Sequence, residues 1–436
     1  MKKWPLWIRV PLQVSAALWL LMAAWVLWDN WGRQASTPST AETLSTTHTD
    51  QQQIERGQYL ARAGNCIACH SVRGQPLMSG ARAIDTPFGT VYSSNLTPDP
   101  ETGLGGWSAQ DFWVALQLGR TPTGRLLVPV FPYNHTRLIS RSDSDALWQW
   151  LQSLPPAHQA QPAHTLRWPL GTQAALAVWR SLYFDASAKV DAPPEAPTAM
   201  QRGAYLVEAL GHCAACHGQR DLLGGFPDVQ DLYGAAMPTQ GWYAPDLLSD
   251  AQTGILSMDT AQWLRRLQTG YHDRSVASGP MAEVVQHSLQ YLSEADAQAM
   301  LVYLQNRARQ QTQIHNAPAP APRWSVLDIG QDIYKNQCAQ CHGKQGEGMP
   351  QAYPSLAGSL AIQQSDPTNL VLSVLQGGYG PSTQLRPSPY GMPPFKLTLD
   401  DRQIAAVLSY VRSQWGNQAS EVTPLQVNRI RASTDH

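Results

Sequence analysis

The most hydrophobic stretch of the chain lies at its N-terminus. Residues 12–28 read LQVSAALWLLMAAWVLW, and Lys2, Lys3 and Arg9 precede them. A run of this length is at the short end for a membrane-spanning helix, and the Trp residues around it are typical of membrane interfaces. A cleaved signal peptide is the alternative, but the exit WDNWG contains no clean small-x-small cleavage site. We therefore expect residues 1–33 to be an uncleaved anchor with one transmembrane helix and a cytoplasmic N-terminus.

Beyond a polar stretch at 34–50, which is typical of a flexible linker, the apolar pattern repeats three times. Each repeat opens with a short helix that carries a glycine at one place: Gly57, Gly203 and Gly330. Glycine in a helix costs about 1 kcal/mol relative to alanine. A glycine that recurs in this way predicts close packing of that helix against another helix.

Each repeat continues with two further helices, after a long loop rich in Pro and Gly. In the first of them apolar residues recur at i, i+3 and i+4, and the helix ends at a glycine. The last helix begins with N-cap and acidic residues. The middle helices are predicted at 108–119, 259–270 and 367–377, and the last helices at 142–154, 293–309 and 399–415.

The composition limits the classes of function. Among 436 residues, 31 Lys and Arg balance 32 Asp and Glu, and this net charge of −1 argues against a nucleic-acid binder with a general basic surface. Only 14% of residues are charged, but 43% are hydrophobic, so the chain has material for several cores and is not disordered. The 32 glycines and 33 prolines indicate much loop between short helices.

The six cysteines form three pairs of one kind. In every pair two residues separate the cysteines, and a histidine follows the second cysteine. The three motifs are Cys66, Cys69 and His70; Cys213, Cys216 and His217; and Cys338, Cys341 and His342. This spacing is typical of c-type haem attachment, in which two thiols bond one haem and the adjacent imidazole binds its iron. The sequence therefore predicts three covalently bound haem c groups, with the histidines as axial ligands.

Other interpretations of the cysteine pairs fit less well. A zinc site needs a second ligand pair close to each motif. A redox dithiol of the thioredoxin kind follows a strand in a βαβ pattern, and this pattern is missing from the sequence. A disulfide framework does not place a histidine at the same offset three times. Three haem sites use all six cysteines and leave none for disulfides.

The sixth iron ligand is expected in the loop before the last helix of each repeat. Met392 lies in the segment YGMPPF of the third repeat, and Met281 lies in SGPMA of the second. Ordinary core filling is the alternative role of a methionine. Because both residues lie beside Pro or Gly ahead of the last helix, we expect them to bind iron.

The first repeat departs from this pattern. Its loop at 128–137 reads VPVFPYNHTR and contains no methionine. His135 is the preferred sixth ligand, which gives an iron with two histidines. Met78 and an open iron remain the alternatives, since Met78 lies only shortly after His70.

These patterns together predict an all-α protein with three tandem class I cytochrome c domains behind an N-terminal transmembrane helix. Haem c attachment takes place in the periplasm of Gram-negative bacteria, which agrees with the expected orientation of the anchor. The expected units are an anchor at 1–33, a linker at 34–50, domain 1 at 51–160, a linker at 161–198, domain 2 at 199–312, an Ala/Pro linker at 313–323, domain 3 at 324–418 and a tail at 419–436.

The sequence resembles the membrane-bound triheme cytochrome c subunits of bacterial periplasmic dehydrogenases. The resemblance covers nearly all of residues 51–430. The segments that carry it are TPFGT at 86–90, NLTPDPETG at 95–103, RGAYLV at 202–207, GHC at 211–213, GWYAP at 241–245, PSLAG at 354–358 and WGN at 415–417. Where the family has Met-Pro-Tyr in the first repeat, this chain has FPY at 131–133.

The resemblance implies an electron-transfer role without substrate chemistry on this chain. A catalytic subunit of quinoprotein, flavin or molybdenum type, with or without a small accessory subunit, oxidises a substrate and reduces the haems. The haems then reduce ubiquinone or another respiratory acceptor, on the periplasmic side of the inner membrane. The FPY variant favours a molybdenum partner.

Two other functions remain open from the sequence. The first is a multihaem peroxidase, favoured by the missing methionine in the first repeat, although no distal acid or base is evident. The second is a carrier that serves a terminal oxidase without a dedicated dehydrogenase.

Overall fold

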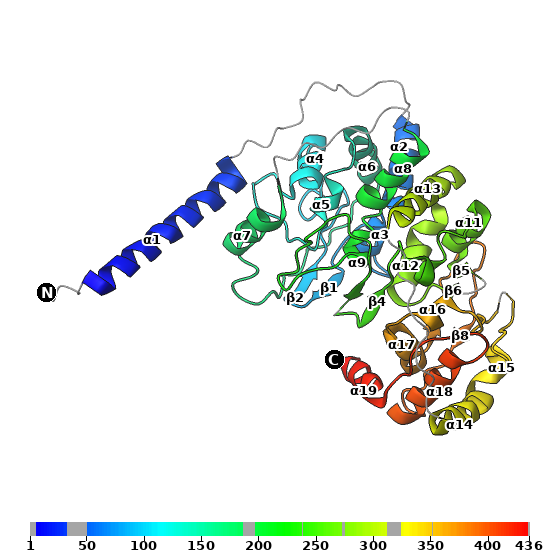
Figure 1. Ribbon diagram of the computed structural model, residues 1–436. Coiled ribbons are helices and arrows are strands. Elements are labelled where there is room, and N and C mark those ends of the chain that lie inside the picture. The colour runs from blue at the N-terminus through cyan, green and yellow to red at the C-terminus, as the bar shows by residue number, and fades with distance from the viewer. Residues whose placement is uncertain are drawn as a thin grey trace.

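The computed structural model describes residues 6–32, 50–185, 197–237, 239–272, 275–311, 324–350 and 352–434. The predicted linker 313–323 and all but the last residue of 34–50 lie outside these ranges. Helices dominate the described residues, and a long N-terminal helix extends away from the rest (Figure 1).

This N-terminal helix, α1 (Leu6–Leu27), continues into a π-helical turn, η1 (Trp28–Gly32). Its described side chains are largely apolar and exposed, among them Leu18, Trp19 and Leu20. Across the described ranges, none of the helices combines the length and the apolarity that a membrane crossing requires. The prediction of a transmembrane helix within 1–33 therefore finds no support in the described residues.

Three pairs of crossing helices form the frame of the remaining chain. In each pair, the helix that leads into a cysteine motif packs against the last helix of the same repeat. The pairs are α2 (Asp50–Ala63) with α6 (Arg141–Gln152), α8 (Ala199–Ala204) with α13 (Glu294–Gln310), and α14 (Trp324–Ile333) with α18 (Asp401–Ser413). The π-helices η2 (Tyr205–Leu210) and η4 (Tyr334–Cys338) continue α8 and α14.

The recurring glycines lie at the crossing points of these pairs. A Cβ added at any of them would collide with a backbone oxygen of the last helix. The distances would be 2.0 Å from Gly57 to Ala146, 2.1 Å from Gly203 to Ala299 and 2.3 Å from Gly330 to Ala406. The prediction of close helix packing at these glycines is confirmed.

The middle helices follow their sequence signals. They are α4 (Ala109–Leu118), α11 (Thr260–Thr269) and α17 (Thr368–Gln376). Ser108 and Asp259 cap α4 and α11 through their side chains, and Gly119 and Gly270 end these helices in left-handed backbone. The predicted middle and last helices are therefore confirmed close to their expected bounds.

Short antiparallel hairpins accompany the helices, so the expected all-α class becomes a largely helical one. The hairpins are β1 (Ala83–Thr86) with β2 (Gly89–Tyr92), β3 (Ala235–Met237) with β4 (Trp242–Ala244), β5 (Tyr271–His272) with β6 (Ser275–Val276), and β7 (Gly378–Tyr379) with β8 (Gly391–Met392). Residues 165–167 add backbone hydrogen bonds to the first hairpin, through Thr165 to Thr90 and Arg167 to Phe88.

The segments expected to be a linker and a tail each contain a helix. The predicted linker 161–198 holds α7 (Gln173–Tyr183), and the predicted tail 419–436 holds α19 (Pro424–Ser433). α19 packs on α17 and α18 and buries Val427 completely. The remaining short helices are α3 (Cys66–His70), α5 (Tyr133–Thr136), α9 (Ala214–His217), α10 (Asp250–Thr253), α12 (Gly279–His287), η3 (Leu289–Tyr291), α15 (Ala339–His342) and α16 (Leu360–Gln363).

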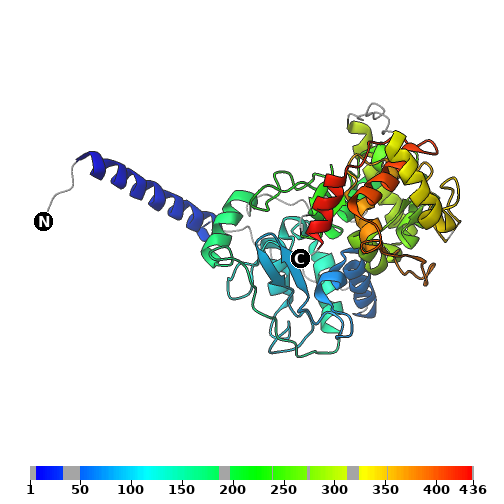
Figure 2. The ribbon, with the colours of Figure 1, turned by 90° about the horizontal axis from the view of Figure 1, so that it is seen from below.

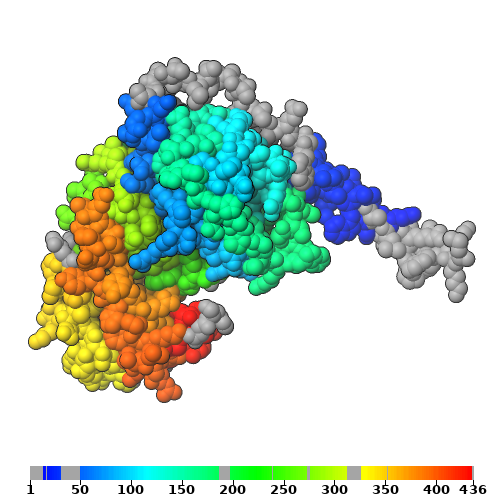
Figure 3. All heavy atoms as spheres, turned by 180° about the vertical axis from the view of Figure 1, so that it is seen from behind, coloured from blue at the N-terminus to red at the C-terminus, as the bar shows by residue number. Residues whose placement is uncertain are grey.

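The hydrophobic cores divide the molecule into two parts. One core runs through the first two repeats and includes Leu60 and Trp150 from the first and Leu206 and Leu304 from the second. The third repeat has separate cores, built around α18. In Figure 3 the yellow and orange surface of the third repeat lies beside the blue and green surface of the first two.

Candidate functional site

The six cysteines lie as free thiols in or directly before the short motif helices α3, α9 and α15. Burial, and after it the second cysteine of the same motif, raises the pKa of Cys66 and Cys213 to about 12 and that of Cys338 to about 11. Thiols that act in disulfide exchange have a lowered pKa instead. Within the described ranges, no three His, Cys, Asp or Glu side chains gather as a metal-ion site.

Each motif histidine makes one hydrogen bond to a backbone carbonyl. The distances from Nδ1 to oxygen are 2.8 Å for His70 with Ser94, 2.7 Å for His217 with Pro245 and 3.1 Å for His342 with Pro354. A carbonyl oxygen only accepts, so Nδ1 carries the proton and Nε2 keeps its lone pair. Burial lowers the pKa of all three imidazoles and keeps them neutral. A neutral imidazole fixed in this way is the donor that haem iron requires.

The backbone enters the first two motifs differently from the third. Asn65 and His212, which precede the first cysteine of their motifs, adopt left-handed backbone with φ of 51° and 37°. This sharp turn ends the preceding helix and starts the motif helix in a new direction. In the third repeat, η4 runs without such a turn into Cys338.

The first two repeats make the same contact in both directions. Tyr59 of the first donates to Asp296 of the second at 2.5 Å, and Tyr205 of the second donates to Asp143 of the first at 2.6 Å. An arginine of the same repeat also binds each carboxylate. These six residues, called the reciprocal junction below, are Arg56, Tyr59, Asp143, Arg202, Tyr205 and Asp296.

Both carboxylates of the reciprocal junction are buried: Asp143 is 2% exposed and Asp296 is 8% exposed. Burial alone raises the pKa of Asp296, but hydrogen bonds from Arg202 and Tyr59 outweigh it and lower that pKa below its usual value. Burial and the bond to Asp296 raise the pKa of Tyr59. At neutral pH the carboxylate is therefore charged and accepts from a protonated phenol.

The reciprocal junction places the first two motifs beside each other. Nε2 of His212, the residue before Cys213, lies 3.3 Å from the carbonyl oxygen of Gly64, which lies just before Cys66. Burial raises the pKa of Cys69, and Cys216 of the other motif also contributes to this shift. Cofactors held by these two motifs are thereby neighbours, whereas the third motif belongs to a separate core.

His135 lies in α5 and is 1% exposed. Its Nδ1 is 3.1 Å from the carbonyl oxygen of Glu208, and its ring meets Phe226 edge to face. Both contacts come from the second repeat, close to the second motif. Nε2 is buried without a hydrogen-bond partner among the described residues. Burial lowers the pKa of His135 to about 4, so the ring is neutral and its Nε2 can bind a metal.

Of the predicted methionine ligands, Met392 lies in a hairpin of the third repeat, and Met281 lies in α12, which packs on the motif helix α3 and on α11. Met392 is in β8, opposite Gly378, and its side chain packs on the core of the third repeat. Met281 lies in the first turn of α12 and is partly exposed. Met78 is buried in the core of the first two repeats, where its sulfur accepts from the Ser71 hydroxyl at 3.9 Å. The ligand roles of all three stay predictions.

Two residues of α11 were missed by the sequence analysis. The indole Nε1 of Trp263 is buried without a hydrogen-bond partner in the described part of the chain. Arg266, one turn further, donates to the Thr253 carbonyl oxygen and acts on the pKa of His217, and burial lowers its own pKa to about 10. Their signal in the sequence was a Trp and an Arg at i, i+3 on a helix that follows the motif. Arg266 offers positive charge beside His217, and Trp263 offers a buried N–H donor one turn away on the same helix, a pair that suits the carboxylates of a haem.

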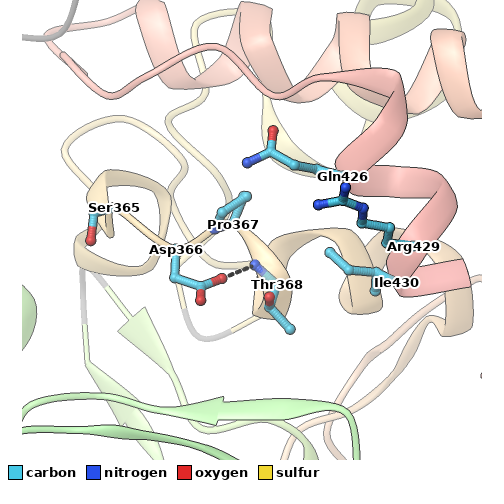
Figure 4. Close-up of a pocket in the computed structure, with 7 residues that line it drawn as sticks. All are labelled: Ser365, Asp366, Pro367, Thr368, Gln426, Arg429 and Ile430. Atoms are coloured by element: carbon cyan, nitrogen blue, oxygen red, sulfur yellow. Dashed lines mark hydrogen bonds between the residues drawn. The ribbon is translucent and has the colours of Figure 1, made fainter. Parts of the chain in front are cut away.

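A surface hollow lies elsewhere, between α17 and α19. It measures about 460 Å³ and is lined by residues such as Asp366, Arg429 and Ile430. Figure 4 shows these side chains and the 2.8 Å hydrogen bond from the Thr368 amide to Asp366. It contains none of the motif residues, so the candidate site remains the set of three motifs.

Known proteins match this chain over nearly its whole length. Residues 327–415, which hold the third motif and Met392, match the family model "Cytochrome c". The gluconate 2-dehydrogenase cytochrome c subunit of Pantoea cypripedii is 36% identical over 87% of this chain and 89% of its own. The cytochrome c subunit of alcohol dehydrogenase (quinone) from Gluconobacter oxydans is 33% identical over 88% and 83%. The fructose dehydrogenase cytochrome subunit of Gluconobacter japonicus is 30% identical over 97% and 90%.

Proposed function

Because the chain belongs to the family of cytochrome c subunits of dehydrogenases, we propose that it is the electron-transfer subunit of such a complex and carries three haem c groups. A catalytic subunit of quinoprotein, flavin or molybdenum type, with or without a small accessory subunit, delivers the electrons. Ubiquinone or another respiratory acceptor receives them. The chain itself carries out no substrate chemistry.

The hydrogen bonds of the three motif histidines carry this proposal. His70, His217 and His342 each donate from Nδ1 to a backbone carbonyl, beside a pair of free thiols. The thiols attach the porphyrin, and each imidazole is fixed with Nε2 available for iron. Donation from Nδ1 also makes Nε2 more basic, which stabilises the oxidised iron. Bound haem supplies one-electron redox chemistry, while the protein supplies its position, burial and polarity.

We assign the sixth ligands to His135, Met281 and Met392. The partnerless, neutral Nε2 of His135 supports its role, since a buried nitrogen without a partner is costly. A filled sixth position suits an electron carrier, whereas a peroxidase needs an open iron. Trp263 and Arg266 are proposed to bind the carboxylates of the second haem.

We further propose that α1 attaches the chain to the bacterial inner membrane, with the haem domains in the periplasm. The exposed Leu and Trp side chains of α1 support this role, because apolar surface of this kind is stable in lipid and costly in water.

A haem count tests the proposed cofactors. We expect three haems per chain by pyridine haemochromogen assay and by mass, and two after replacement of both cysteines of one motif by alanine. Purification in mild detergent is expected to retain a large catalytic subunit, whose substrate reduces the haems. A chain that purifies alone and turns over peroxide with a five-coordinate haem contradicts the proposal.

Ligand variants test the sixth positions. Met392→Ala is expected to convert one haem from low spin to high or mixed spin, whereas Met349→Ala, at an exposed methionine of the same repeat, leaves all spectra unchanged. His135→Ala is expected to change the spectrum of the first haem, and because His135 contacts the second repeat, the second haem is measured as well. An unchanged low-spin signal in either ligand variant removes that residue as a ligand.

A further inference from the structure

One exposed face of the molecule is apolar, and it lies beside the C-terminal end of α1. Its side chains come from α7, from the loop before α7 and from the turn that follows the second motif. Trp168 is 87% exposed and Leu222 is 96% exposed. The six residues, called the α7 face below, are Trp168, Leu170, Val178, Leu182, Leu222 and Leu223.

α7 is apolar on two sides. Leu176 and Ala177 are buried and face the first repeat, as expected for a surface helix. Val178 and Leu182, four residues apart on the opposite side, are exposed. A helix at a water-exposed surface normally carries polar residues there. The outer side of α7 therefore has the composition of a surface covered by something apolar.

Hydrogen bonds join the separate segments of the α7 face into one surface. The indole Nε1 of Trp179 donates to the Leu223 carbonyl oxygen at 3.0 Å, and the Tyr183 hydroxyl donates to Asp221. These bonds fix the turn 221–224 against α7. On the other side of this turn, Gly224 approaches the ring of Phe88, whose carbonyl accepts from the Arg167 amide.

The C-terminal end of α1 and the following turn η1 are fixed directly to α7. The Asn30 side chain donates to the Ala177 carbonyl oxygen at 3.0 Å and to the Ser181 hydroxyl at 2.9 Å, and it accepts from Arg180 at 3.1 Å. Val26 adds an apolar contact in the same place. Figures 1 and 2 show α7 beside this end of α1 from two directions. The position of α7 relative to a membrane is thus set by α1.

We propose that the α7 face lies on the headgroup region of the lipid bilayer, next to the C-terminal end of α1. The proposal rests on the membrane attachment of α1 proposed above. η1 follows α1 without a break and contacts α7, so α7 is adjacent to the C-terminal end of the helix proposed to attach to the membrane. An exposed Trp beside exposed Leu side chains is the composition that interfacial segments use.

The charges around the α7 face suit anionic lipid. Arg167 precedes Trp168 and is exposed. Arg125, also exposed, lines with Trp168 and His164 a hollow of about 470 Å³. Cationic side chains near a bilayer are attracted to anionic headgroups. The nearby Asp221 accepts a hydrogen bond from the Tyr183 hydroxyl.

Hydroxyl-radical footprinting of the full haem-loaded chain on phosphatidylglycerol-containing vesicles tests the proposal. Leu222 and Leu397, which are 96% and 98% exposed, form a matched pair, and Leu397 belongs to the third repeat. We expect Leu222 and Trp168 to be oxidised several-fold more slowly than in the vesicle-free chain, and Leu397 to be unchanged. Vesicle flotation, measured in parallel, reports the attachment of α1 separately.

The outcomes separate the two proposals. A chain that floats with vesicles while Leu222 stays as reactive as Leu397 overturns the lipid-contacting face but leaves the anchor intact. A chain that does not float overturns both. Protection of Leu222 that appears only after the catalytic subunit is added assigns the face to a protein partner instead. Val178→Ser with Leu182→Ser should weaken the protection, whereas Leu385→Ser with Leu397→Ser should not, with haem spectra as the check of folding.

Discussion

The first two repeats and the third use one helix frame but are joined to the molecule in different ways. The first two share a hydrophobic core and the reciprocal junction, whereas the third has its own cores. In the third repeat, Ile329 occupies the position of Arg56, directly before the crossing glycine. Gln403 occupies the position of Asp143, near the start of the last helix. The side chains that join the first two repeats are thus replaced in the third.

The third repeat is joined to the second by neutral hydrogen bonds and by Arg386, which lies 5.0 Å from the ring centroid of Tyr271. Asn369 in α17 donates to the Tyr243 carbonyl oxygen at 2.7 Å and accepts from the Tyr243 amide at 2.9 Å. Gln290 accepts from the Gln384 amide at 2.9 Å. Bonds of this kind are weaker than those to a buried charge. The comparison teaches that repeats with one helix frame can share a hydrophobic core in one place and keep separate cores in another.

Alanine at Gly57 is expected to have the largest effect, because its Cβ would lie 2.0 Å from the Ala146 oxygen. We expect the free energy of unfolding to fall by about 4 kcal/mol. Since the first two repeats share a core, both should unfold together, whereas Gly330→Ala should unfold the third repeat alone. Denaturation followed by pulse proteolysis and mass spectrometry distinguishes the repeats. A second repeat that survives Gly57→Ala would break the comparison.

Asp143→Ala tests the reciprocal junction itself. It leaves Arg56 and Tyr205 without their acceptor, and we expect a loss of about 3 kcal/mol in the free energy of unfolding of the first two repeats. The matched variant Gln403→Ala, at the same position of the third repeat, removes only an exposed capping bond from the Asp400 amide and should cost about 0.5–1 kcal/mol. Equal effects in urea titrations of the two variants would show that the junction adds nothing.

Acid should weaken the first two repeats more than the third. The pKa of Asp296 is lowered in the folded state, so its stabilisation is complete above the unfolded-state pKa of about 3.9 and is lost as pH falls through the lower folded value. The pKa of Asp401 is also lowered, by Asn428 and Arg431 against burial, but this pair lies closer to the surface and is screened. The free energy of unfolding is measured from about pH 5 to pH 2. Its dependence on pH should weaken more in Asp296→Asn than in Asp401→Asn.

The smallest expected effect concerns the junction of the third repeat. Asn369→Ala removes both bonds to Tyr243 and should cost about 1 kcal/mol of coupling between the second and third repeats. Proteolytic release of the third repeat should become faster, while its haem spectrum stays the same. Asn428→Ala, within the third repeat and away from the second, is the control. Faster release in the control as well would assign the effect to the third repeat alone.

Local signals were sufficient for the helices. A cap at Ser108 and a glycine at position 119 define α4 within a dozen residues, so the sequence alone predicts its ends. α7 lies in the predicted linker 161–198, a segment with several prolines. Its exposed side is apolar, whereas a surface helix usually has polar residues on that side. The hairpins contain too few residues to give a period.

The site residues could be predicted only where they lie within one turn of the chain. The spacing of Cys66, Cys69 and His70 predicts the motif, but the bond from His70 to the Ser94 carbonyl depends on the folded loop. The bond between Tyr59 and Asp296 joins residues 237 positions apart. The sequence likewise proposed His135 as a ligand, while its contact with Glu208 became visible only when the two repeats were packed together.

The reciprocal junction has the form of a two-fold symmetric interface. A Tyr of the first repeat donates to an Asp of the second, and a Tyr of the second donates to an Asp of the first. Contacts between the subunits of a homodimer have this reciprocal form. The first two repeats are in this sense a covalent dimer, with the third attached as a monomer. An interface of this form fixes the relative orientation of the two repeats twice over, because each repeat supplies both a donor and an acceptor.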